Sequence, residues 1–187
     1  MRSIILLGLA LALTAACGET LLPKASFPNE VDTVSIYALS GTPVAAPSAY
    51  SMELRQAVRI DQSGGAFDFA FDIDSAGRAV LLPTGALKLG RQSGILLTTT
   101  PFDSIRVAPG GNYQRDSAVV VDSNSVAIVH SRSLRCPTIG LSAVLYGKLH
   151  VLAIDTTSAP GGRRIDLRIL TDVNCGYRGL QEGLPNR

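Results

Sequence analysis

The sequence predicts an all-β protein built as an antiparallel β-sandwich, with an open β-barrel as the alternative arrangement. Three observations predict this class. No sustained apolar stripe of helical period follows residue 17. Instead, short apolar segments of period two recur along the chain. Turns rich in Gly, Pro, Asp, Asn and Ser separate these segments at close intervals, which is typical of strands joined by short loops.

The strands are expected, in chain order, at residues 31–39, 55–60, 67–74, 78–82, 87–89, 95–99, 117–121, 126–131, 145–155 and 164–171. A loop rich in Pro and Ala is expected at residues 40–50. The clearest alternation predicts an inward face made of Phe67, Phe69, Phe71 and Ile73. It predicts an outer, solvated face made of Asp68, Ala70, Asp72 and Asp74. In the last strand the inward residues are expected to be Ile165, Leu167 and Ile169.

Four hairpins follow from the turns between these strands. They pair residues 67–74 with 78–82, 87–89 with 95–99, 117–121 with 126–131, and 145–155 with 164–171. The first has a tight turn in which Gly77 suits a positive φ.

The first seventeen residues have the organisation of an export signal. A short charged start, Met1 to Ser3, precedes an apolar run from Ile4 to Leu13 and the small residues Thr14-Ala15-Ala16. The apolar run is too short to cross a bilayer, which needs about 20 residues, so a retained membrane-spanning helix is the weakest reading.

Cys17, placed directly after these small residues, resembles the lipobox of bacterial lipoproteins. The resemblance implies cleavage before Cys17, a diacylglycerol on its thiol and an acyl chain on the new amine, with no other cofactor expected. One position departs from the family, because Thr14 stands where leucine is usual. An ordinary secretory cut after Ala16, which leaves Cys17 free, is therefore kept as the alternative.

This organisation divides the chain into a signal peptide at residues 1–16, a lipidated tether at residues 17–30 and one all-β domain at residues 31–187. The expected location is the cell envelope, with the lipid anchor holding the protein on a membrane. By analogy with enteric lipoproteins, Gly18 after the cysteine favours the outer membrane. The sequence identifies no protein partner.

The remaining cysteines, Cys136 and Cys175, are predicted to form a disulfide, because an exported chain with one such pair most simply oxidises it. The bond would stabilise the fold by roughly 3–4 kcal/mol on the chain-entropy model. Two buried free thiols, or one reactive thiol, are the alternatives.

The strongest candidate site for chemistry is the acidic set Asp68, Asp72 and Asp74. Asp72 and Asp74 partly resemble the start of a calcium loop, although Ala76 and Pro83 stand where further ligands are needed. A carboxylate pair could also serve glycoside hydrolysis. The competing reading is a hairpin whose aspartates cap the turn and keep one face soluble.

No other set of residues resembles a catalytic centre. The two histidines, His130 and His150, fit packed or rim positions, and no nucleophile elbow, phosphate loop or zinc set occurs. Arginine clusters at 132–135 and 163–164 are small, and a net charge of +2 does not favour nucleic-acid binding. The sequence therefore favours a non-enzymatic binding or structural role, with a calcium-dependent or hydrolytic enzyme on the Asp68/Asp72/Asp74 face as the alternative.

Overall fold

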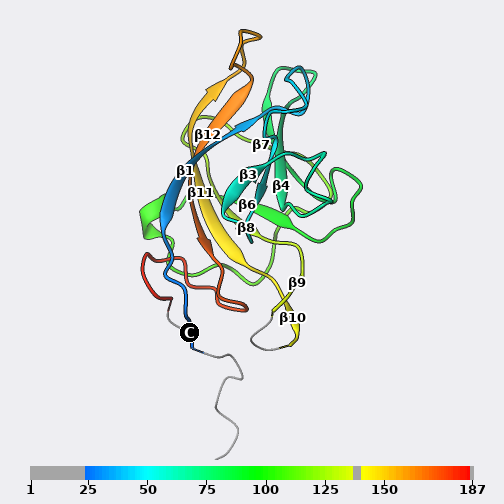
Figure 1. The fold of residues 1–187 in the computed structure, drawn as a ribbon. Coiled ribbons are helices and arrows are strands. Elements are labelled where there is room, and N and C mark those ends of the chain that lie inside the picture. Colours follow the sequence, from blue (N-terminus) through cyan, green and yellow to red (C-terminus); the bar gives the residue numbers. More distant parts are fainter. Residues whose placement is uncertain (1–23, 137–139, 186–187) are drawn as a thin grey trace, which may run out of the picture.

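The computed structural model describes residues 24–136 and 140–185, within which the chain forms an antiparallel β-sandwich (Figure 1). The first sheet has five strands, in the order β1 (Val31–Tyr37), β12 (Arg164–Asp172), β11 (Tyr146–Asp155), β8 (Val126–His130) and β6 (Gly94–Thr98). The second has the order β3 (Gln56–Val58), β2 (Ala49–Ser51), β4 (Phe69–Ile73), β5 (Ala79–Pro83) and β7 (Val119–Val120). The sheets do not close into a barrel, so the predicted sandwich is confirmed. The predicted signal peptide and Cys17 lie outside the described residues.

Two short elements complete the described fold. A two-stranded ribbon, β9 (Leu134–Arg135) with β10 (Ser142–Ala143), extends from the end of β8. A 3₁₀ turn, η2 (Phe102–Ser104), lies in the long connection between β6 and β7.

Two of the predicted hairpins are confirmed. β4 pairs with β5 across a turn in which Gly77 has a φ of 77° and Asp74 accepts hydrogen bonds from the backbone. β11 pairs with β12 along most of their length. Both hairpins have strong local alternation and join strands that are consecutive in the sequence, so the local pattern was enough to predict their pairing.

The other two predicted hairpins are wrong, and the short strands β2, β9 and β10 were not predicted. Residues 87–89 form turns instead of a strand, and β6 pairs with β8. β7 pairs with β5 in the second sheet, so the chain passes from one sheet to the other at Asp122–Ser125. Ala49–Ser51 was predicted as loop because of the prolines before it, yet β2 begins just after Pro47 and is fully buried.

The core lies between the two sheets and follows the predicted alternation in most places. Ile165, Leu167 and Ile169 face inward from β12, as predicted, and Phe69 and Phe71 face them from β4. The ladder of β4 begins only at Phe69, and the alternation fails at the two residues before it. Phe67 packs on the opposite face of the second sheet, against Ala49 and Ala70. The predicted solvated face is therefore partly a second apolar layer.

A further apolar cluster covers the outer face of the first sheet. The β6–β7 connection and the C-terminal segment pack there, contributing Phe102, Ile105, Ala108 and Leu180 against Ile128 and Leu170. In Figure 1 these are the green 3₁₀ turn beside the first sheet and the red segment below it.

The end of the predicted tether is part of the fold. Asn174 Oδ1 accepts hydrogen bonds from the backbone N–H groups of Ser26 and Phe27, at 2.8 and 3.1 Å. Asn29 is buried and exchanges two backbone hydrogen bonds with Gly183. The packed chain thus begins by Ser26, five residues before the predicted start of the domain.

Candidate functional site

The three aspartates of the predicted acidic site have separate structural roles. Asp72 accepts hydrogen bonds from the backbone N–H and the hydroxyl of Ser40, at 3.0 and 2.9 Å. Asp74 caps the β4–β5 turn and forms an ion pair with Arg78 at 2.7 Å; the hydrogen bond from the Arg78 backbone N–H, and then the one from its guanidinium, lower the pKa of Asp74. Within the described residues, no group of three or more His, Cys, Asp or Glu side chains could hold a metal ion.

Asp68 is the aspartate whose environment differs most from its prediction. Its side chain is fully buried and accepts hydrogen bonds from the backbone N–H groups of Met52 and Arg132, at 2.7 and 2.8 Å. The Arg132 guanidinium bridges Asp68 and the exposed Glu53. Burial raises the pKa of the Asp68 carboxyl, although these hydrogen bonds act in the opposite direction. Asp68 therefore links the segment after β8 to the β2–β3 turn. Its carboxylate is occupied by these structural partners.

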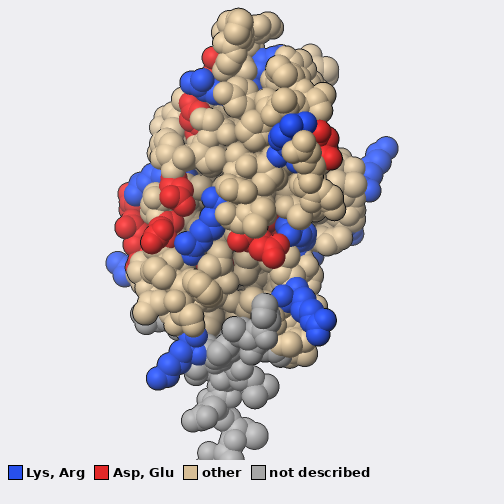
Figure 2. All heavy atoms as spheres, in the orientation of Figure 1, with Lys and Arg blue, Asp and Glu red and all other residues tan. Residues whose placement is uncertain are grey.

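Most of the arginines in the two small predicted clusters form contacts within the fold. Arg163 Nε donates to the backbone oxygen of Ser40 at 2.7 Å, and Arg164 forms an ion pair with Asp166. Basic and acidic side chains are interspersed on the face shown in Figure 2.

The two histidines lie in different surroundings. His150 is half-buried on β11, with its ring 6.5 Å from the ring of Phe102. Next to it on the same strand, the buried Lys148 donates to the backbone oxygens of Phe102 and Ile105, which fixes η2 on the sheet. His130 is buried at the end of β8, beside a hollow in the surface.

This hollow, here called the His130 pocket, is the strongest candidate site in the described structure. It has a volume of about 350 Å³, and its lining includes Arg91, Tyr113, Arg115, His130, Ser133 and Tyr146. None of its lining residues is acidic. A volume of this size lies at the small end of the range for small-molecule sites, about 300–1,000 Å³.

Three strands and one loop build the pocket. Gly94, His130 and Tyr146 are register partners across β6, β8 and β11, so their side-chain positions form one row. The loop is part of the β6–β7 connection. It runs along the edge of β6, where Gln114 exchanges two backbone hydrogen bonds with Ile95. This bridge places the neighbours of Gln114, Tyr113 and Arg115, at the pocket.

Gly94 allows the close approach that shapes the pocket. A Cβ atom at Gly94 would lie 2.7 Å from His130 Nε2 and 2.7 Å from Tyr113 Cβ. The imidazole occupies this space and meets the Tyr113 ring edge-on, with centroids 4.7 Å apart. No local sequence pattern predicts this contact, since the three residues come from separate segments.

The hydrogen bonds of His130 define its tautomer. Nδ1 lies 2.9 Å from the backbone oxygen of Ser131, so Nδ1 carries the proton and donates it. Nε2 is then an acceptor, buried and without a hydrogen-bond partner in the described part of the chain. Burial lowers the pKa of His130, and the nearby Arg115 adds to this effect. The imidazole is consequently neutral at neutral pH.

The tyrosines give the pocket an aromatic wall. Tyr113 donates its hydroxyl to the backbone oxygen of Pro109 at 2.9 Å, and burial raises its pKa to about 12. Tyr146 lies 6.5 Å from His130 between ring centroids, and the Arg178 guanidinium lies 5.9 Å from the Tyr146 ring centroid. The Tyr113 phenol therefore stays protonated at neutral pH.

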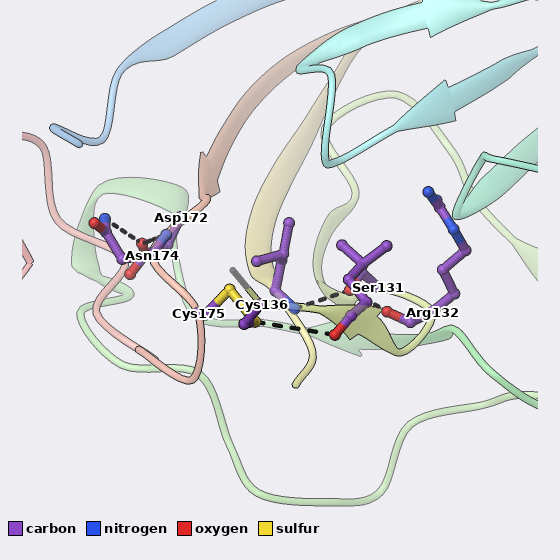
Figure 3. The surroundings of a disulfide bond; sticks show 8 residues. Ser131, Arg132, Cys136, Asp172, Asn174 and Cys175 are labelled. Carbon is purple, nitrogen blue, oxygen red and sulfur yellow. Dashed lines mark hydrogen bonds between the residues drawn. A yellow bond between two sulfur atoms is a disulfide. The ribbon is translucent and has the colours of Figure 1, made fainter. Parts of the chain in front are cut away.

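The disulfide supports the part of the pocket wall that lies beside the β9–β10 ribbon. Cys136 and Cys175 are joined as predicted, with Cα atoms 6.0 Å apart. Figure 3 shows the bond linking the segment after β9 to the loop after β12, near Ser131 and Arg132. Ser133 and Val144, which line the pocket, flank the ribbon that this bond fastens.

Of these pocket residues, the sequence singled out only His130. Tyr113, Arg115 and Tyr146 carry no motif, and only the sheet register brings them together. No helix in residues 24–136 or 140–185 is long and apolar enough to cross a membrane. No protein-family model matches the chain, and no curated protein sequence matches it.

Proposed function

We propose that this protein is an exported, lipid-anchored envelope protein whose β-sandwich has a non-enzymatic binding role at the membrane surface. Cys17 is the proposed site of the diacylglycerol and of the acyl chain on the new amine. More than one acyl chain makes membrane attachment stable, whereas a single chain binds only marginally.

The observation that carries the proposal is the short path from Cys17 to the sandwich. Ser26 is already hydrogen-bonded to Asn174, so only residues 18–25 lie between the cysteine and the packed chain. Even fully extended, these residues would span less than roughly 30 Å. A lipid on Cys17 would hold this end of the sandwich next to the bilayer.

The His130 pocket lies at the same end. Tyr146 is the register partner of Asp172, whose Oδ1 accepts hydrogen bonds from Asn174. Asn174 in turn holds Ser26. A pocket near the anchored end suits a protein that binds its ligand close to the membrane, and the structural partners of Asp68, Asp72 and Asp74 give no support to chemistry on that face.

The test is the intact mass of the protein from its native membrane fraction, without reductant, beside the variant Cys17→Ser. We expect residues 17–187 plus acyl chains and minus two hydrogens, and an uncut chain in the variant. Thr20→Ser, beyond the cleavage site, is the matched control and should be processed like the wild type. An unacylated chain cut after Ala16 in the soluble fraction would overturn the proposal.

A further inference from the structure

We infer that the His130 pocket binds a small organic anion, a carboxylate or phosphate monoester with a flat apolar body, held by Arg115 and by the rings of Tyr113 and Tyr146. This inference deepens the proposed binding role and rests on it only for the location of the ligand. Four features of the pocket carry it.

The first feature is charge. Two guanidinium groups, from Arg91 and Arg115, line the pocket, and no acidic residue does. Arg91 is neutralised from outside the lining by an ion pair with Asp116 at 2.5 Å. Within the described residues no salt bridge joins Arg115 to a carboxylate. Arg115 is thus an unpaired cation at a concave site, and a guanidinium binds carboxylate and phosphate oxygens through paired N–H donors.

The second feature is the aromatic wall. Tyr113 and Tyr146 lie on either side of the His130 ring, at 4.7 and 6.5 Å between centroids. The Tyr113 phenol, whose pKa is raised to about 12, is uncharged at neutral pH and does not repel an anion. Aromatic rings favour offset or edge-on contact with another flat ring, so this wall suits a ligand with an aromatic or other flat body.

The third feature is an unsatisfied polar atom. Buried polar atoms without a partner are rare in native structures, and each destabilises the fold. Within the described residues His130 Nε2 is such an atom; its side chain lines the pocket, and the nitrogen itself is enclosed beside Gly94 and Tyr113. Packing alone does not require an imidazole there, whereas a neutral imidazole keeps one side of the pocket polar without adding charge.

The fourth feature is rigidity. The strand ladder fixes His130 and Tyr146, the Gln114–Ile95 bridge fixes the loop, and the disulfide fastens the β9–β10 ribbon. A site that is already formed loses less conformational entropy when a ligand binds, so small ligands bind it more tightly.

The experiment is a calorimetric titration of the mature protein, purified from whichever cell fraction contains it and kept in detergent micelles, with phenyl phosphate as the probe. We expect saturable binding with one site, and no binding of benzyl alcohol, which has the ring without the charge. Inorganic phosphate, which has the charge without the ring, should bind at least tenfold more weakly than phenyl phosphate.

Two variants locate the site. Arg115→Gln should weaken phenyl phosphate binding at least tenfold, and Arg106→Gln, an exposed arginine outside the pocket lining, should leave it unchanged. Ser133→Trp should block the pocket by filling it, and Ser123→Trp, exposed in the turn between β7 and β8, is its control. Binding that is unchanged in both pocket variants, or that does not saturate, would overturn the inference.

Competition distinguishes two sources of the anion. If the natural ligand is a lipid headgroup, phosphatidylglycerol added to the micelles should displace phenyl phosphate from the wild type. If it is a soluble anion, benzoate should displace the probe and the lipid should not. These results do not depend on acylation of Cys17, so failure of the lipid-anchor proposal and failure of the pocket remain separate outcomes.

Discussion

Two polar regions of this protein lie side by side in sequence and differ in every respect that matters for function. His130, at the end of β8, borders an open pocket, and its Nε2 has no hydrogen-bond partner in residues 24–136 or 140–185. Arg132, two residues later, binds Asp68 and Glu53 and holds the first sheet to the second. Between them, the Ser131 hydroxyl accepts the Leu145 N–H at 2.8 Å and donates to the Arg132 backbone oxygen.

The comparison teaches how to separate structural from functional polar groups. The aspartate face was the stronger candidate by sequence, yet each of its carboxylates is occupied by donors from the protein. The pocket had no motif, yet among the described residues its Arg115 has no salt-bridge partner and its His130 Nε2 has no hydrogen-bond partner. A group whose hydrogen bonds are already made within the fold contributes to stability, whereas an exposed cation beside a cavity, such as Arg115, is available to a ligand.

The largest expected effect is that of Asp68→Ala. The change leaves two buried backbone N–H groups and part of the Arg132 guanidinium without an acceptor, so we expect the free energy of unfolding to fall by roughly 3–5 kcal/mol. Denaturant unfolding measures it. Asp72→Ala, whose partners are exposed, is the control and should cost less than about 1 kcal/mol. Equal losses in the two variants would contradict the distinction between Asp68 and the rest of the acidic face.

The disulfide between Cys136 and Cys175 contributes to stability and also supports one wall of the pocket. Replacing both cysteines, Cys136→Ser with Cys175→Ser, should lower the free energy of unfolding by about 2–4 kcal/mol. Because the ribbon that carries one pocket wall then loses its link to the β12 loop, phenyl phosphate should also bind more weakly. Unfolding and titration of the same preparation measure both. A variant that loses stability with unchanged binding would show that the wall is rigid without the bond.

The sequence predicted the parts of this fold that neighbouring residues determine. The β4–β5 and β11–β12 hairpins follow from alternation and a short turn, and the disulfide follows from the number of cysteines. The separation of β7 from β8 into different sheets does not, because Asp122–Ser125 has the composition of a hairpin turn yet crosses between layers.

The same limit applies to the candidate site. Alternation placed Asp68 on a solvated face, but the ladder of β4 begins one residue later and the carboxylate turns toward Arg132. Tyr113, Arg115 and Tyr146 meet only through pairings between residues distant in sequence, such as the bridge between Gln114 and Ile95. Such pairings depend on the whole topology, which single-sequence patterns do not specify.

The pH dependence of the free energy of unfolding tests whether His130 is neutral in the folded protein. Burial lowers its pKa in the folded state below the ordinary value of 6.5. Between the folded and unfolded pKa values the unfolded chain binds more protons, so the free energy of unfolding decreases as the pH falls below about 6.5. We expect His130→Phe to lose less stability than the wild type between pH 7.5 and pH 6. Parallel losses in the two proteins would mean that His130 is not the group responsible.

The smallest expected effect is that of calcium, and it tests the acidic face directly. A calcium site needs six to eight oxygen ligands, whereas Asp72 and Asp74, at the end of β4, are already bonded to Ser40 and Arg78. Binding calcium would require breaking the Asp74 turn cap, which holds the β4–β5 hairpin. We therefore expect millimolar calcium to leave the melting temperature unchanged, with magnesium as the ionic-strength control. A rise in melting temperature that is specific to calcium and absent in Asp72→Ala would restore the acidic face as a binding site, and the pocket would then be one of two.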